Sequence, residues 1–228
     1  MKSIRSSDNP FFKELVKLAG SARQRSKANQ TLLDGAHLLA AYLDAGMLPQ
    51  HIMLNATALR DEEITALIER VGDVPITQLD DKLFAELSDL KTPTGILALI
   101  DLPQPDTAVA DSNFALLLED IQDPGNLGSM LRSAAAAGCD AVFLSKGCAD
   151  AWSPKVLRAA MGGHFALRIC EQQNLLDVSR AFPGTLLAAS LHATRSLYGC
   201  NLRGNIAFLI GNEGAGLSAE LLNLVTQT

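Results

Sequence analysis

The 228 residues are 48% hydrophobic and carry 25 acidic against 19 basic side chains, a net charge of −6. This length and apolar content suffice for one large domain or two small ones, and the acidic balance argues against a protein that coats nucleic acid indiscriminately. The longest apolar runs, such as residues 114–118, are far shorter than a membrane span. No apolar stretch follows Lys2 and Arg5 as in a signal peptide, so we expect a cytoplasmic protein.

Apolar spacing in the first hundred residues predicts a small α/β unit. Helices are expected over residues 9–18, 37–45, 61–71 and 80–87, and strands over residues 32–33, 51–55 and 95–100. Residues 101–112 contain two prolines and three aspartates and are predicted to form a linker.

After this linker, strands and helices alternate. Strands are expected over residues 114–118, 141–144, 165–170, 185–190 and 206–210, and a helix over residues 127–137. Ser153 is a candidate N-cap with Pro154 at the first helical position, and Gly162 ends that helix. The alternation predicts a mostly parallel sheet, and the chain is predicted to divide into domains of residues 1–105 and 112–228.

Basic residues concentrate near the amino terminus. Residues 1–30 hold seven basic and two acidic side chains, which include Arg23, Arg25 and Lys27. Such a surface can dock phosphates, although from charge alone a solvated helix face is the simpler interpretation. The four cysteines and four histidines have no metal-ligand spacing, so we expect buried free thiols and no metal.

Three segments that follow predicted strands carry unusual residues. The first, residues 119–132, follows a buried strand without G-x-G-x-x-G order; Asn126 is placed to cap the next helix, and Arg132 projects from its second turn. In the second, Lys155 and Arg158 share one helical face, as phosphate contacts require. Taken alone, a capped helix and solvated charges explain both. The third, residues 210–217, has three glycines directly after an apolar strand, which predicts backbone that lies against a ligand.

In this order, D-P-G-N-L-G-x-x-x-R, S-P-K-x-x-R-A-A-x-G and I-G-N-E-G-A-G-L resemble the three motifs of SpoU (TrmH-like) RNA ribose 2′-O-methyltransferases. Residues 7–11, 32–35 and 91–96 are similar to the family's amino-terminal, L30e-like substrate-binding domain. The resemblance covers essentially the whole chain. Asp34 departs from it, because relatives commonly carry glutamate there.

The resemblance implies an α/β fold: a small L30e-like domain in residues 1–105 that binds RNA, either rRNA or tRNA, and a SPOUT methyltransferase domain with a trefoil knot in residues 112–228. It implies S-adenosylmethionine as cofactor and a homodimer. The sequence itself predicts no membrane span and no metal. The residues implied are Asn126, Arg132 and Glu213 for catalysis and Gly211, Asn212, Gly216 and Leu217 for the cofactor. The charge pattern adds Arg23, Arg25, Lys27, Lys155 and Arg158 as predicted RNA contacts.

Relatives continue past Thr228 with an I-P-M segment and a serine-leucine-asparagine motif that complete the pocket and thread the knot. We therefore expect an incomplete knot and little affinity for S-adenosylmethionine in this chain. A guanidinium is a poor base because it keeps its proton, so Arg132 is interpreted as a clamp for the ribose phosphate and developing alkoxide, with Glu213 and Asn126 holding Arg132 or the RNA. Two alternatives stay open at this point: a non-catalytic RNA-binding protein that keeps the fold, and a nucleotide-dependent oxidoreductase, against which the missing G-x-G-x-x-G speaks.

Overall fold

A computed structural model describes residues 2–88, 90, 92–104, 108–190, 193 and 196–225. It divides into two compact units: unit 1 holds Met1–Pro103 with Trp152–Phe165, and unit 2 holds Gln104–Ala151 with Ala166–Thr228. The boundary at Pro103 falls in the predicted linker, whose residues 105–107 lie outside the described residues. Unit 1 is therefore discontinuous in sequence, because Trp152–Phe165 comes some fifty residues after Pro103. The predicted domains, 1–105 and 112–228, are each continuous.

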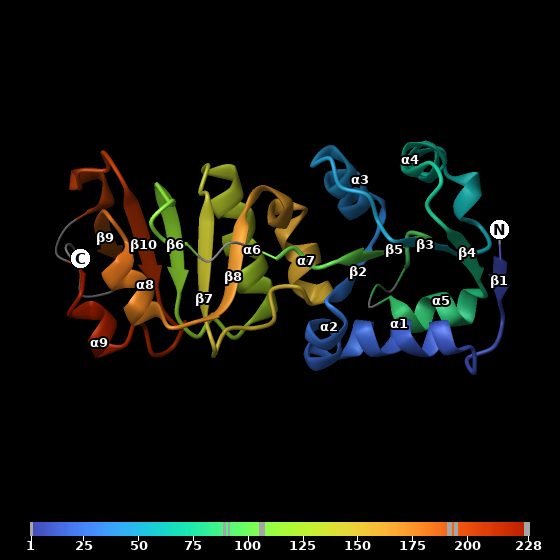
Figure 1. Cartoon of the computed structure of the whole chain (residues 1–228), viewed down its shortest axis with the longest axis horizontal. Coiled ribbons are helices and arrows are strands. Elements are labelled where there is room, and N and C mark those ends of the chain that lie inside the picture. Colours follow the sequence, from blue (N-terminus) through green and yellow to red (C-terminus); the bar gives the residue numbers. More distant parts are fainter. Residues whose placement is uncertain are drawn as a thin grey trace. The chain divides into compact units, whose positions relative to one another are not determined.

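Unit 1 is built on a mixed sheet (Figure 1). Its strands lie in the order β1 (Lys2–Ile4), β4 (Ile76–Leu79), β3 (His51–Leu54), β5 (Ile96–Asp101) and β2 (Gln30–Asp34). The first three run parallel, and β5 pairs antiparallel with both β3 and β2.

Helices cover both faces of this sheet (Figure 1). On one face lie α1 (Pro10–Gly20) and α5 (Asp81–Leu87), where Phe12 and Phe84 belong to one apolar cluster with β-strand side chains. On the other lie α3 (Ala36–Asp44) and α4 (Glu62–Val71). The short α2 (Ala22–Ala28) follows α1, and α7 (Pro154–Ala160) packs against β2.

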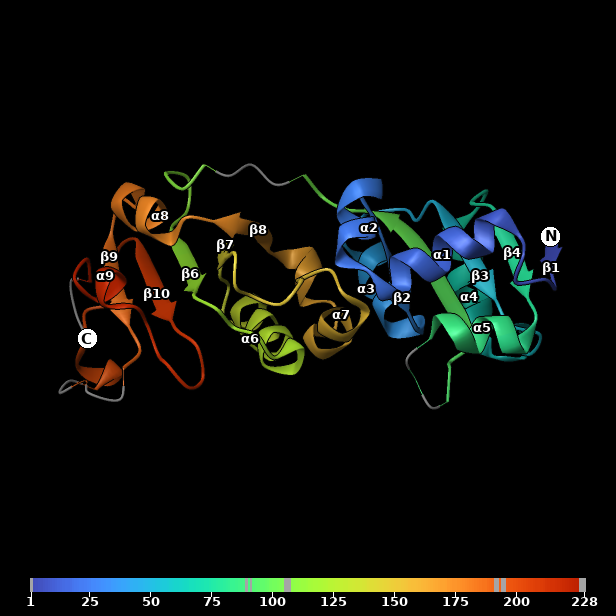
Figure 2. The same cartoon turned by 90° about the horizontal axis from the view of Figure 1, so that it is seen from below.

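Unit 2 contains the mostly parallel sheet predicted from the alternating pattern. Its order is β8 (Arg168–Gln173), β7 (Ala141–Ser145), β6 (Phe114–Leu118), β10 (Ile206–Ile210) and β9 (Thr185–Ala188), and every pair is parallel. Helices α6 (Pro124–Ala136) and α8 (Leu175–Ala181) lie on opposite faces (Figure 2). Alternate strand residues such as Leu117, Phe143 and Leu209 pack with Val178 of α8, because successive side chains of a strand point to opposite faces.

Two predicted elements start at the wrong residue, each by three positions. Helix α6 begins at Pro124 with Asp123 as its N-cap, so Asn126 lies inside the first turn instead of capping the helix. Strand β8 begins at Arg168, because Gly163–Ala166 forms a 3₁₀ turn where the strand was expected to start. The sequence prediction also omitted β1, α2, β4, α8 and α9 (Ala219–Leu222). Among the described residues, the helices are all too short or too polar to cross a membrane.

Candidate active site

The carboxyl ends of β10, β6 and β7 lie next to one another along one edge of the unit 2 sheet. Ligands of open parallel sheets bind at this edge. Three segments begin there: residues 211–217, here named the glycine loop, after β10; Glu119 and Asp120 after β6; and residues 146–148 after β7.

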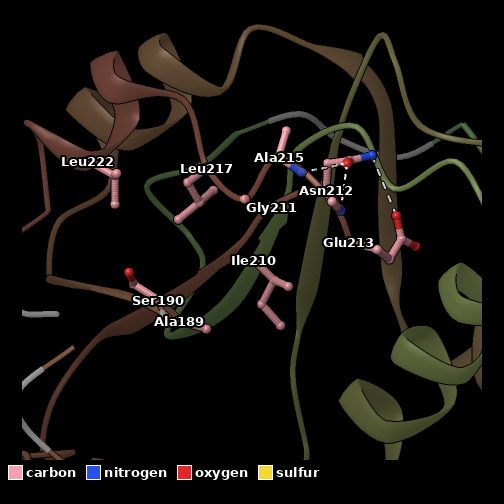
Figure 3. Close-up of a pocket in the computed structure, with 11 residues that line it drawn as sticks. Ala189, Ser190, Ile210, Gly211, Asn212, Glu213, Ala215, Leu217 and Leu222 are labelled. Atoms are coloured by element: carbon pink, nitrogen blue, oxygen red, sulfur yellow. Dashed lines mark hydrogen bonds between the residues drawn. The ribbon is translucent and has the colours of Figure 1, made fainter. Parts of the chain in front are cut away.

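Asn212 organises the glycine loop. Its side-chain Oδ1 accepts hydrogen bonds from the backbone N–H of Gly214 at 2.9 Å and of Ala215 at 3.0 Å, and its carbonyl accepts from Gly216 N–H at 2.9 Å. Figure 3 shows the Asn212 side chain turned toward Ala215 and Glu213. A Cβ on Gly211 would lie only 2.2 Å from the Gly216 carbonyl carbon, so the two arms of the loop touch through backbone.

A cavity of about 530 Å³ opens against this loop (Figure 3). Besides the loop, Ala189, Ser190, Ile210 and Leu222 line it. Its volume lies in the range of about 300–1,000 Å³ that is usual for small-molecule sites. Apolar side chains and a few polar groups share the wall, as is typical of such sites.

The first and third motifs meet at this edge. Asn126 Nδ2 donates a hydrogen bond of 2.9 Å to Glu213 Oε1, although the two residues lie 87 positions apart. Asp123 holds Asn126 in place, because its Oδ1 accepts from Asn126 N–H at 2.8 Å. The contact supports grouping Asn126 and Glu213 in one site, which the sequence could suggest only through family resemblance.

Arg132 lies exposed on α6, one to two turns beyond Asn126. Its guanidinium makes no hydrogen bond or ion pair with any residue that the structure describes. Glu213 therefore holds Asn126 and not Arg132, and the arginine remains available for a ligand.

Two residues at the end of β6 hold the glycine loop, and the sequence prediction missed both roles. Glu119 Oε2 accepts from Ser218 N–H at 2.7 Å, just beyond the loop, and the Asp120 carbonyl accepts from Asn212 Nδ2 at 2.9 Å. The signal was present in the sequence, because two acids directly after a buried strand are out of place in an ordinary connection.

The second motif, residues 153–162, lies in unit 1. Lys155 is exposed on α7. Arg158 Nη1 lies 3.6 Å from Oδ2 of Asp34, whose side chain is 2% exposed. Ser88 Oγ donates to the same oxygen at 2.7 Å. Arg158 is thus engaged with a buried carboxylate, which was not foreseen when it was predicted to contact phosphate.

The three basic residues predicted to contact RNA near the amino terminus differ in exposure. Arg23 and Lys27 are exposed on α2. Arg25 is 5% exposed, and its Nη1 donates to the carbonyls of Leu18 at 2.5 Å and Ala19 at 3.1 Å. These carbonyls end α1 and have no partner within that helix. The Arg25 guanidinium thus caps a helix, which was not foreseen when Arg25 was predicted to contact RNA.

The thiols and potential metal ligands point to no further chemistry in the described part of the chain. Cys139 and Cys170 are buried as predicted, whereas Cys148 and Cys200 are partly exposed. Burial raises the pKa of the Cys139 thiol to about 11 and also raises the pKa of Cys148, so both stay protonated near neutral pH. No group of three or more His, Cys, Asp or Glu side chains suited to a metal occurs among the described residues.

Comparison with known proteins identifies both parts of the chain. Residues 113–228 match the SpoU rRNA methylase family, and residues 9–98 match the MRM3-like substrate binding domain. The 23S rRNA (guanosine(2553)-2′-O)-methyltransferase RlmP of Bacillus subtilis is 32% identical over 225 residues, which cover 97% of this chain and 87% of that protein.

Other relatives are longer. The mitochondrial rRNA methyltransferase 3A of Danio rerio is 35% identical over 76% of this chain, and the match covers 41% of that protein. The chain thus spans about two fifths of its length. A solved RNA 2′-O ribose methyltransferase superposes with a TM-score of 0.79 at 29% identity, covering 98% of this chain and 87% of the other.

Proposed function

The chain belongs to the SpoU rRNA methylase family, and from this premise we propose that it transfers a methyl group from S-adenosylmethionine to a ribose 2′-hydroxyl of structured RNA. The observation that carries the proposal is the hydrogen bond between Asn126 and Glu213. It joins the first and third motifs beside the cavity at the glycine loop, at the sheet edge where ligands bind.

The cavity fits such a cofactor, so the proposal includes its binding to this chain, in contrast to the low affinity that the sequence alone led us to expect. Leu217, Leu222 and Ile210 provide an apolar wall for an adenine ring, while Asn212 and Ser190 provide polar groups. Gly214 and Gly216 leave backbone uncovered for close approach, and Gly211 lets the two arms of the loop touch. When bound, S-adenosylmethionine supplies a methyl group on a sulfonium. Gly211, Asn212, Gly216 and Leu217 are proposed to hold it.

The residues of the chain then act mainly by positioning, which is the larger part of what this transfer requires. Arg132 is proposed to clamp the ribose phosphate and to stabilise charge that develops on the 2′-oxygen, since a guanidinium keeps its proton. The proton of the 2′-hydroxyl then passes to the RNA phosphate or to water. Glu213 fixes the amide of Asn126 so that Asn126 can orient the RNA. The need for a 2′-hydroxyl selects RNA over DNA.

Residues 1–105 are proposed to bind the RNA, with Arg23 and Lys27 as phosphate contacts because both are exposed. Lys155 is exposed as well and is proposed for the same role. The choice of rRNA over tRNA follows the name of the B. subtilis relative. A homodimer and a cytoplasmic location complete the proposal, the latter in line with a bacterial relative that matches nearly the whole chain.

The test is methylation of RNA in vitro with isotopically labelled S-adenosylmethionine. Label should enter total rRNA but not DNA of matching sequence, and the modified linkage should resist alkaline hydrolysis because its 2′-oxygen is blocked. Glu213→Ala, which removes the partner of Asn126, should lose most of the incorporation. Label that enters a base, or incorporation that survives Glu213→Ala at the full rate, would contradict the proposal.

A further inference from the structure

Asp120 adopts an unusual backbone conformation next to the glycine loop. Its φ is +54°, one of four positive values among the non-glycine residues that the structure describes. L-residues rarely adopt this left-handed conformation without local support, although aspartate tolerates it better than most. The residue lies two positions after β6, beside the glycine loop, so the direction of its carbonyl decides what the neighbouring loop can contact.

Ser145, the last residue of β7, supports that conformation with two hydrogen bonds. Its Oγ accepts from the Asp120 backbone N–H at 2.9 Å and donates to Asp120 Oδ1 at 2.6 Å. Both the main chain and the side chain of Asp120 are therefore fixed by one hydroxyl group.

The Asp120 carboxylate occupies space beside Gly147 that is free only because Gly147 has no side chain. A Cβ at Gly147 would lie 2.1 Å from Asp120 Oδ1, and no Cβ approaches an oxygen that closely. A side chain at this position would expel the carboxylate from Ser145. The end of β7 is thus shaped to receive Asp120.

The consequence reaches the glycine loop through Asn212. In its left-handed conformation Asp120 presents its carbonyl to Asn212 Nδ2 at 2.9 Å. This contact orients the Asn212 amide so that Oδ1 accepts from Gly214 and Ala215. The same Nδ2 lies 3.5 Å from Glu213 Oε2. Ser145, Asp120 and Asn212 therefore form a continuous series of hydrogen bonds that ends in the cavity wall.

We propose that Ser145 is a positioning residue for S-adenosylmethionine: it fixes Asp120 so that the Asp120 carbonyl orients Asn212 and, through it, the glycine loop. Ser145 does not line the cavity and acts only through Asp120. The inference rests on the proposed function for the identity of the ligand. The series of hydrogen bonds itself belongs to the protein without ligand.

The first experiment is hydrogen exchange on the ligand-free chain. Ser145→Ala removes both hydrogen bonds to Asp120, so the amides of Gly214 and Ala215 should exchange at least about fivefold faster. Ser145→Thr keeps the hydroxyl and should restore the slow exchange. Ser179→Ala is the matched control, because Ser179 Oγ on α8 has no hydrogen-bond partner among the described residues. Unchanged exchange in Ser145→Ala would overturn the inference.

The second experiment is calorimetric titration with S-adenosylmethionine. The loss of about two hydrogen bonds predicts roughly tenfold weaker binding by Ser145→Ala, while kcat at saturating cofactor should stay within about twofold. Gly147→Ala should weaken binding similarly, because it displaces the Asp120 carboxylate and leaves Ser145 intact. Binding by both variants at the wild-type affinity would refute a positioning role. A wild-type chain that binds no S-adenosylmethionine would instead refute the proposed cofactor, and the exchange measurement would still decide the role of Ser145.

Discussion

Gly211→Ala is expected to weaken binding of S-adenosylmethionine more than alanine at either other glycine of the loop. The new Cβ would lie 2.2 Å from the Gly216 carbonyl carbon and 2.3 Å from Leu217 N, whereas ordinary van der Waals contact begins at 3.4 Å. All these atoms belong to backbone, so relief requires the two arms of the loop to separate by about 1 Å. Overpacking of this kind costs about 1–3 kcal/mol.

If the cofactor binds the undistorted loop, that cost appears in its affinity. A difference of about 1–3 kcal/mol corresponds to an increase in Kd of roughly 5- to 150-fold. Gly216→Ala meets no atom within 4 Å but must adopt φ +72°, which costs about 1 kcal/mol and predicts about fivefold weaker binding. Gly214→Ala needs no positive φ, and its nearest atom is Asn212 Oδ1 at 3.5 Å. It should have the smallest effect of the three.

Isothermal titration calorimetry of S-adenosylmethionine binding to the wild-type chain and the three variants measures this order directly. Gly20→Ala serves as a control outside the site, because a Cβ there meets nothing within 4 Å. Thermal unfolding of each variant would show whether the loop change stays local. Gly211→Ala binding as tightly as Gly214→Ala would refute the claim that backbone contact between the arms shapes the cofactor site.

Three other substitutions test separate parts of the molecule. Arg132→Ala should lower the single-turnover methylation rate by at least about 100-fold without changing cofactor affinity, and an unchanged rate would remove Arg132 from the mechanism. Arg23→Glu with Lys27→Glu should weaken RNA binding and reduce the slope of log K against log salt by about two; an identical slope would exclude both as phosphate contacts. Asp34→Ala should destabilise the chain by about 1–3 kcal/mol in urea unfolding, because it takes a partner from the partly buried Arg158; wild-type stability would show that the pair contributes nothing.

Local sequence patterns predicted the three central strands of the second sheet well, because β6, β7 and β10 are almost continuous apolar runs, whereas the start of the more polar β8 was missed. Residues 114–118 and 206–210 were predicted with the bounds that β6 and β10 have. Ser153 caps α7 ahead of Pro154, as expected. The same pair of signals, Asp123 before Pro124, marked the true start of α6 and was overlooked in favour of Asn126.

Long-range contacts could not be predicted in the same way. Nothing in the local sequence distinguishes Arg25 from its exposed neighbours, because its burial depends on where α1 ends relative to α2. Arg158 likewise looks like a surface residue until Asp34, 124 positions earlier, is known to be buried beside it. Charged side chains are thus assigned to a surface or to a structural pair only by tertiary packing.

The candidate site depends on backbone packing more than on the strength of its side-chain hydrogen bonds. Asn126 and Glu213 are both exposed, and a hydrogen bond that competes with water contributes only about 0.5–1.5 kcal/mol. The backbone of Gly211 and Gly216, in contrast, lies so close that no side chain fits at position 211. This packing does not depend on whether water reaches the site. Bound cofactor and RNA would displace that water and lower the local dielectric, which strengthens the same hydrogen bonds. The polar pair therefore acts chiefly in the substrate complex, whereas the glycines shape the site before any ligand arrives.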